Sequence, residues 1–230
     1  VKFLLKEAIS KGWNFFKMKV GSGLENDIKR SKMIREIIGP DRHLMMDANQ
    51  AWGVEEAIEN MKILSQFNPA WIEEPTSPDD ILGHARIAKE LKNIPVATGE
   101  HCHNAVMFKQ FMQAKAMQIC QLDSCRLASI NEIIAVLLLA WKFNIKVCPH
   151  AGGVGLCEYV QHISMFDYTR ISNSTEGKVL EYIDHLHEHF VDPVIVKNGF
   201  YLAPTQPGYS IQMKNQTLKD YNFKTGKIWN

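Results

Sequence analysis

Six ionisable residues stand at nearly even intervals along the chain, each at the end of a short apolar run: Lys19, Asp47, Glu73, Glu100, Asp123 and His150. The intervals are 28, 26, 27, 23 and 27 positions, taken as differences of the residue numbers. One strand, one helix and two short loops occupy about that much chain. Repeated βα units bring the ends of their strands to one rim of a barrel, where enzymes of this architecture do their chemistry. The spacing therefore predicts an α/β fold, a (β/α) barrel of the TIM type with an ionisable rim.

The apolar runs predict seven strands in one direction. They are FFKMKV (15–20), HLMMDAN (43–49), WIEEP (71–75), IPVATGE (94–100), AMQICQLD (116–123), IKVCPHAG (145–152) and a weaker one over 168–172. Helices are predicted near 1–11, 25–38, 54–67, 81–92, 104–114, 128–142 and 179–189. Continuous apolar strands are typical of a parallel sheet covered on both faces. No G-x-G-x-x-G follows a strand, which favours a barrel over an open doubly wound sheet.

Composition narrows the classes of partner. With 230 residues and 46% apolar content, the chain can bury a large core, and its net charge of +1 favours neither nucleic acid nor an anionic membrane surface. The longest apolar stretch, 133–141, is too short to span a bilayer and is predicted to be a buried helix. The five cysteines are odd in number and lack C-x-x-C spacing, which predicts free thiols in a reducing intracellular compartment.

Two lysines flank Met18 in the first predicted strand. Because side chains alternate along a strand, Lys17 and Lys19 share one side of the sheet. Two like charges in a low-dielectric site lower each other's pKa, which can make a lysine a base near neutral pH. The alternative is an edge strand whose lysines point to water.

Three carboxylates, Asp47, Glu73 and Glu100, end consecutive predicted strands. Three such groups at one rim repel each other unless a cation neutralises them, and Mg²⁺ suits a few carboxylates with positions left for water or substrate. Glu73 and Glu74 point to opposite sides of a strand, so only one can be a ligand. The spacing favours Glu73, and Glu74 is expected to pair outside the barrel lumen.

Asp123 and His150 end two further strands. A carboxylate on one imidazole nitrogen fixes the tautomer and raises basicity, which suits His150 to acid–base chemistry, and a core histidine with a hydrogen-bond partner is the alternative. His101 and His103 follow Glu100, but the thiols and imidazoles form no closed tetrahedral zinc set, so structural or substrate contacts are expected of them. Glu181 is expected where the last strand meets its helix, with its side chain able to reach the rim.

In this order, KMK (17–19), DAN (47–49), IEEP (72–75), GE (99–100), Asp123 of QLD and His150 of CPHAGG resemble the mandelate racemase branch of the enolase superfamily. More narrowly, GEHCHN, CPHAGGVGLCE, EYIDHLHEHFVDP and the stretch from APTQPGYS to KTGKIW look like the L-fuconate dehydratases. The match covers nearly the whole chain, and six ordered motifs at family spacing are specific.

The resemblance implies roles for these residues. Asp47, Glu73 and Glu100 would bind one Mg²⁺, which holds the carboxylate of a small-molecule sugar acid. Lys19 would remove the proton next to that carboxylate, and Lys17 and Glu181 would hold the developing oxyanion. His150, oriented by Asp123, would protonate the departing β-hydroxyl to leave a 2-keto-3-deoxy acid, and Asn49 would contact the substrate. The resemblance also implies a mitochondrial location, with the cytosol as the alternative.

Members of this family carry an N-terminal α+β capping domain and a first barrel strand before the K-x-K strand. Neither stands in this sequence, and the chain has no initiator methionine. We therefore expect a segment of a larger enzyme or a shortened variant inactive by itself, with a barrel domain over 1–190 and an extended segment over 191–230 that wraps toward the cap. Unpaired sheet edges would invite homo-oligomer formation. The rival functions are a racemase or epimerase of a 2-hydroxy acid, and an inactive barrel fragment that acts through protein contacts.

Overall fold

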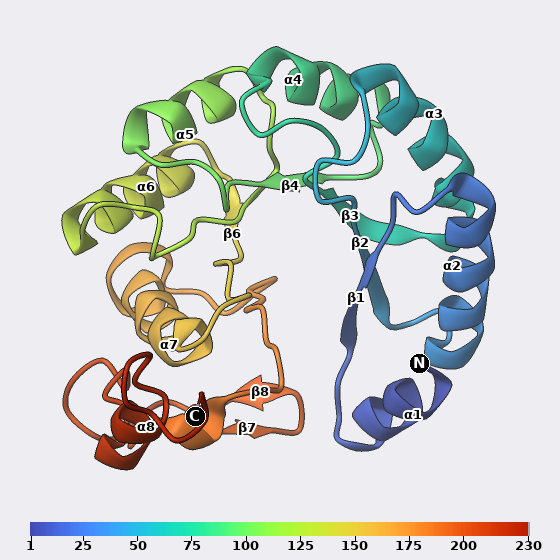
Figure 1. Cartoon of the computed structure of the whole chain (residues 1–230). Coiled ribbons are helices and arrows are strands. Elements are labelled where there is room, and N and C mark those ends of the chain that lie inside the picture. Colours follow the sequence, from blue (N-terminus) through green and yellow to red (C-terminus); the bar gives the residue numbers. More distant parts are fainter. Residues whose placement is uncertain (230) are drawn as a thin grey trace.

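The computed structural model describes residues 1–229, and its centre is a sheet of six parallel strands in the order β1-β2-β3-β4-β5-β6. The strands are β1 Phe15–Lys19, β2 His43–Asp47, β3 Pro69–Glu73, β4 Val96–Thr98, β5 Ile119–Cys120 and β6 Lys146–Val147. The sheet curves as part of a barrel, and within residues 1–229 its end strands β1 and β6 do not pair with each other (Figure 1). The predicted α/β fold with an incomplete parallel barrel is confirmed.

Helices connect the strands and cover the outer side of the curve (Figure 1). They are α1 Lys2–Ser10, α2 Leu24–Ile38, α3 Val54–Leu64, α4 Ile81–Glu90, α5 Ala105–Gln113, α6 Ile130–Lys142 and α7 Leu156–Phe166, with a 3-10 turn at Ser65–Phe67. Side-chain caps begin three of them: Asp80 accepts from the Gly83 amide, Asn104 from the Met107 amide and Ser129 from the Glu132 amide. Such caps satisfy amides that have no partner inside the helix.

The register of the strands brings the residues at their ends side by side. Lys19 pairs with Asp47 across β1 and β2, and Asp47 pairs with Glu73 across β2 and β3. Because side chains alternate along each strand, this face also carries Met45 and Trp71. Both belong to an apolar cluster of the barrel interior, which therefore forms the floor below the charged rim.

The opposite face of the sheet packs on the helices. Met46 and Ile72 are fully buried there, in a cluster with Ile38 of α2 and Leu64 of α3. A second cluster joins α5, α6 and the strands β5 and β6. Burial of this apolar surface stabilises the strand positions, and hence the positions of the side chains at the strand ends.

Two predicted elements are wrong. The predicted strand over 168–172 is a π-helix, Asp167–Ser172, which continues directly from α7, a helix that the sequence reasoning missed. Its aromatic and β-branched composition favours a strand, but Ile171 packs against the α5–α6 cluster, and tertiary packing outweighs propensity. The predicted helix over 179–189 is irregular except for a 3-10 turn at His187–His189, and the φ of +66° at Leu186 is incompatible with a helix interior.

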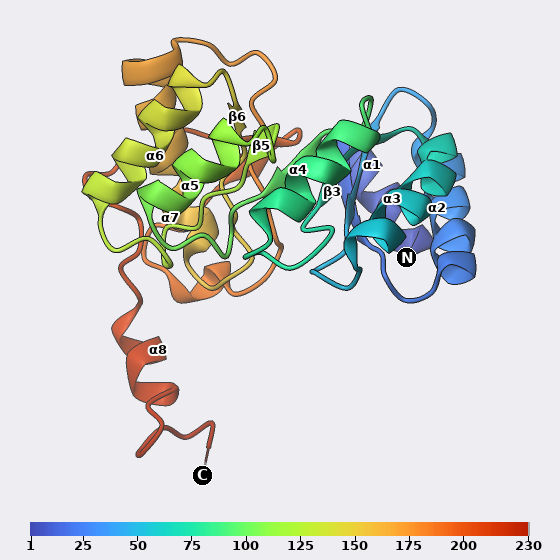
Figure 2. The same cartoon turned by 90° about the horizontal axis from the view of Figure 1, so that it is seen from above.

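The C-terminal part adds a hairpin of β7 Val196–Lys197 and β8 Phe200–Tyr201, and a short helix α8 Asn215–Asp220. Seen from above, α8 and the residues after it extend away from the barrel (Figure 2). The division into 1–190 and 191–230 stays a prediction, and residue 230 lies outside the described residues. Within residues 1–229, no helix has the length and apolar content that crossing a membrane requires.

Candidate active site

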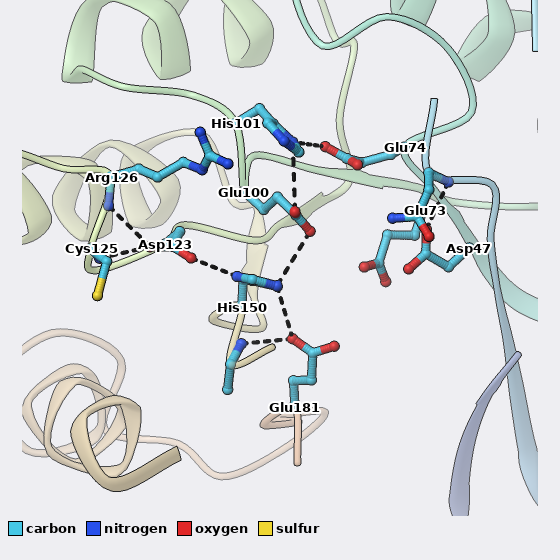
Figure 3. A network of polar contacts seen from close by, with 12 residues as sticks. Asp47, Glu73, Glu74, Glu100, His101, Asp123, Cys125, Arg126, His150 and Glu181 are labelled. Atoms are coloured by element: carbon cyan, nitrogen blue, oxygen red, sulfur yellow. Dashed lines mark hydrogen bonds and ion pairs between the residues drawn. The ribbon is translucent and has the colours of Figure 1, made fainter. Parts of the chain in front are cut away.

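The predicted rim residues meet in one polar network at the carboxyl ends of the strands, and Figure 3 shows its carboxylates and histidines. Lys17 lies at its centre. Its Nζ donates to Glu73 Oε1 at 2.7 Å and to Glu181 Oε1, and lies 3.5 Å from Asp47 Oδ2. Burial opposes its charge, but the carboxylates of Glu73, Glu181 and Asp47 outweigh burial and raise the pKa of Lys17. The expected lowering of its pKa by Lys19 is therefore wrong.

Lys19 differs from Lys17 in its access to solvent. Its Nζ lies 2.5 Å from Asp47 Oδ2, and 60% of its side chain is exposed, against 21% for Lys17. An exposed amine at the rim can meet an entering molecule, whereas Lys17 is enclosed by its acidic partners. The structure thus separates two lysines that the sequence pattern treats alike.

Asp47 and Glu73 are each 1% exposed, and they differ in pKa. Burial opposes the charge of Asp47, but Lys17, the hydrogen bond from Lys19 and the Asn49 amide keep its pKa below the usual range. Burial raises the pKa of Glu73 to about 7, and the lowering by Lys17 does not offset it. The lysines at this rim therefore do not supply enough positive charge to keep both buried carboxylates ionised.

Glu100 belongs to a second part of the network. Burial also raises its pKa, and its side chain lies between two histidines, with Oε2 3.4 Å from His150 Nε2 and Oε1 3.6 Å from His101 Nδ1. His101 Nδ1 in turn donates to Glu74 Oε1 at 2.6 Å. The potential ligand atoms of Glu74, Glu100 and His101 all lie within 4.8 Å of one another.

The strand pattern predicted that Glu74 pairs outside the barrel lumen, and this prediction is wrong, because Glu74 pairs with His101 at the rim. Its φ of +41° ends the alternation of β3, so its buried side chain turns toward His101 and accepts a hydrogen bond from Gln50 at 3.0 Å. A non-glycine residue with positive φ is uncommon and costs backbone strain. Asn49 and Gln50 also have positive φ, at +43° and +66°, so the strained backbone is concentrated at this rim.

His150 and Asp123 form a hydrogen-bonded pair, as predicted. His150 Nδ1 donates to Asp123 Oδ2 at 2.6 Å, and the amides of Cys125 and Arg126 donate to Asp123 Oδ1 at 2.6 and 3.0 Å. Burial opposes the charge on His150, but the hydrogen bond to Asp123 and the nearby carboxylates of Glu181 and Glu100 raise its pKa. The ring is thus held with Nε2 toward the carboxylates and favours its protonated form.

Glu181 reaches the rim from an irregular segment, not from a strand end. Besides Lys17, its carboxylate accepts a hydrogen bond from the Ala151 amide at 2.6 Å, and it lies 3.8 Å from His150 Nε2. Burial opposes its charge, but Lys17 and the Ala151 amide lower its pKa. It therefore links the lysine of β1 to the chain that follows His150.

Comparison with known proteins shows the family to which this chain belongs. A family described as "Enolase C-terminal domain-like" matches residues 2–217. The chain belongs to this family. It falls in the mandelate racemase branch of the enolase superfamily, as the resemblance predicted.

Two curated relatives match the whole chain. Mitochondrial enolase superfamily member 1 of Xenopus laevis is 58% identical over 231 residues, and L-galactonate dehydratase of Hypocrea jecorina is 50% identical over 235 residues. The chain spans about half the length of each, at 52%.

Two solved structures share its fold. The crystal structure of human mitochondrial enolase superfamily member 1 is 56% identical, with a TM-score of 0.96 over 99% of this chain and 52% of that one. The structure of L-talarate dehydratase from Polaromonas, complexed with Mg and L-glucarate, is 27% identical, with a TM-score of 0.80 over 92% of this chain and 56% of that one.

Asn49 also belongs to the site predicted from the sequence. Its amide donates to Asp47 Oδ1 at 2.9 Å, so its backbone orients a predicted metal ligand, while the substrate contact of its side chain stays a prediction. Sequence reasoning missed Gln50 and the Glu74–His101 pair. Gln50 directly follows the DAN motif, and Glu74 and His101 each follow a predicted ligand, so adjacency was the available signal.

Proposed function

We propose that this chain carries the active site of a Mg²⁺-dependent sugar-acid dehydratase, which converts L-fuconate or a similar aldonate to its 2-keto-3-deoxy acid. One observation carries the proposal: the exposed Lys19 on β1, at Asp47, and the hydrogen-bonded His150–Asp123 pair after β6 stand at one rim with a group of carboxylates between them. A sugar-acid dehydratase among the relatives supports it. Because the chain spans 52% of that relative, we propose the activity for the full-length form.

Asp47, Glu73 and Glu100 would hold the Mg²⁺, because this hard cation prefers carboxylate oxygens. The raised pKa values of Glu73 and Glu100 support these ligands, since a cation would supply the charge that Lys17 does not. Glu74 and His101 suit it less well, because they already satisfy each other. When bound, Mg²⁺ neutralises the substrate carboxylate and the second negative charge that forms on it.

Lys19 takes the proton from the carbon next to the substrate carboxylate. Lys17, held by Glu181 and Glu73, donates to the oxyanion that develops, and Glu181 fixes the direction of that donor. Asn49 contacts the bound acid from the loop after β2.

His150 delivers a proton from Nε2 to the β-hydroxyl, whose bond to carbon breaks, so that water leaves. Its raised pKa favours the protonated ring, and Asp123 holds Nδ1 so that Nε2 is the donor. The enol that remains then becomes the 2-keto-3-deoxy acid.

The test is Mg²⁺-dependent formation of 2-keto acids from a panel of sugar acids, by residues 1–230 and by a longer chain that contains them. We expect Lys19→Ala and His150→Ala each to lose turnover by about a hundredfold or more while staying folded. Lys29→Ala, at an exposed position on α2, is the matched control. Retained turnover in either site variant would refute the roles, and product of unchanged mass would indicate racemisation.

The ligand set has a separate test. By isothermal titration calorimetry, Glu73→Gln should lose Mg²⁺ binding, whereas Glu74→Gln should keep it. The opposite result would place the cation at Glu74, Glu100 and His101. The names of the relatives also lead us to propose a mitochondrial location, which imaging of the tagged full-length protein tests.

A further inference from the structure

The segment that carries Glu181 cannot by itself fix the position of the Glu181 side chain. Residues 173–186 form no helix or strand, yet the Glu181 carboxylate meets both Lys17 and the Ala151 amide. A side chain on an irregular segment is held only as firmly as the contacts around it. Those contacts come from the β7–β8 hairpin, which contains none of the predicted rim residues.

The phenol of Tyr201 supplies one of them. Its Oη donates to the backbone carbonyl of Glu181 at 2.7 Å, and its side chain lies near the Cys157 thiol. That thiol lies 3.7 Å from the carbonyl of Ala151, whose amide binds the Glu181 carboxylate. Tyr201 therefore binds the Glu181 side of the Glu181–Ala151 hydrogen bond directly, from a strand twenty residues further along the chain, and lies beside the thiol that binds Ala151.

Aromatic rings connect the same tyrosine to β1. The Tyr201 ring meets the edge of Tyr182 at 5.9 Å, and Tyr182 stacks on Trp13 at 5.0 Å, with 29° between the planes. Trp13 lies four positions before Lys17. Such ring pairs hold preferred geometries, so the stack fixes the Glu181 segment against the strand that carries Lys17.

The turn of the β7–β8 hairpin packs closely on the backbone of the loop between α1 and β1. A Cβ at Gly199 would lie 2.6 Å from the Gly12 carbonyl oxygen, and one at Gly12 would lie 2.9 Å from the backbone of Asn198. Both glycines have positive φ, at +75° and +86°. The two backbones thus touch where only glycine fits.

We propose that Tyr201 is a positioning residue, which works through the β7–β8 hairpin to hold the Glu181 carboxylate between Lys17 and the Ala151 amide. The catalytic consequence rests on the proposed function, because Glu181 matters for turnover only if Lys17 stabilises the oxyanion. The positioning itself does not depend on the reaction. The C-terminal hairpin is thereby part of the active-site support.

The test compares Tyr201→Phe, which keeps the ring and removes the hydroxyl, with Tyr168→Phe at an exposed position. Hydrogen exchange of the substrate-free protein should become several-fold faster at Ala151 and over 178–186 in Tyr201→Phe alone, with the melting temperature and exchange elsewhere unchanged. Unchanged local exchange overturns the proposal, and so does faster exchange throughout the barrel, which would show a general structural role. Gly199→Ala should speed exchange over the same segment, through the displaced hairpin turn.

Kinetics then separate this inference from the proposed function. In an active enzyme, Tyr201→Phe should lower kcat about three- to tenfold, the range of one neutral hydrogen bond, and leave KM within about twofold. The same substitution in a Glu181→Gln background should have almost no further effect, because it acts through Glu181. Full additivity of the two substitutions overturns the coupling. Absence of turnover in the wild type refutes the proposed function, while the exchange result still decides the positioning.

Discussion

The metal-free protein should lose folding stability as pH rises, because the buried carboxyl group of Glu73 ionises. Replacement of Glu73 by glutamine is expected to remove this loss. Glu73 is 1% exposed, and burial raises its pKa from the ordinary 4.5 to about 7. Between those two values the unfolded chain has released the proton and the folded protein still binds it. Folding stability therefore falls as pH rises through this window.

The size of the effect follows from the shift. The rise in pKa from 4.5 to about 7 corresponds to about 3 kcal/mol of folding stability, which is fully present below pH 4.5 and fully lost above about pH 7. Glutamine resembles the protonated side chain and cannot ionise. Relative to wild type, Glu73→Gln should therefore become more stable by about 3 kcal/mol between pH 4.5 and pH 7.5.

Urea unfolding in EDTA across this pH range measures the difference between the two proteins, so other titrating groups cancel to first order. Glu56→Gln, at an exposed position on α3, controls for the loss of one negative charge. Added Mg²⁺ should stabilise wild type at pH 7.5 and have little effect on Glu73→Gln. Parallel stability curves for wild type and Glu73→Gln would refute the reasoning, because they would mean that burial does not raise the pKa of Glu73.

Three further results are expected. Asp123→Asn should lower the pKa of His150, which an NMR titration measures. Because the pKa of His150 is raised in the folded protein, protonated His150 contributes folding stability below pH 6.5, and this stability is lost as pH rises through the folded-state pKa. The variant should not show this pH-dependent loss of stability. Glu158→Gln breaks a 2.6 Å pair of a buried carboxylate with His187 and should cost about 1–3 kcal/mol in urea unfolding. Ile72→Ala, at a fully buried position, should cost about 2–5 kcal/mol, and a loss below 1 kcal/mol would contradict the close packing of the sheet on its helices.

Much of the rim could be predicted because it depends on local order along the chain. Parallel strands joined by helices end at the same rim, so equal spacing along the sequence becomes proximity in space for Lys19, Asp47 and Glu73. The Asp123–His150 pair follows from the same rule, applied to two adjacent strands. No long-range information is needed for these contacts.

Positions that depend on the backbone turning out of a strand could not be predicted. Period-two alternation sends Glu74 away from the site, but a positive φ brings it back to His101. The pKa of Lys17 also went the opposite way, because its neighbours in space are carboxylates from other strands and its neighbour in sequence is a lysine. The electrostatic interaction between two charges depends on their distance in space, which the sequence does not give.

The sequence by itself determined the repeated βα order, the parallel rim and the types of group that stand there, because each depends on spacing and side-chain period. The tertiary structure alone decided which lysine is enclosed and which is exposed, how Glu181 reaches the rim from an irregular segment, and that a distant hairpin holds it. These features arise from packing between segments far apart in the chain. Their energies depend on contacts that no local pattern encodes.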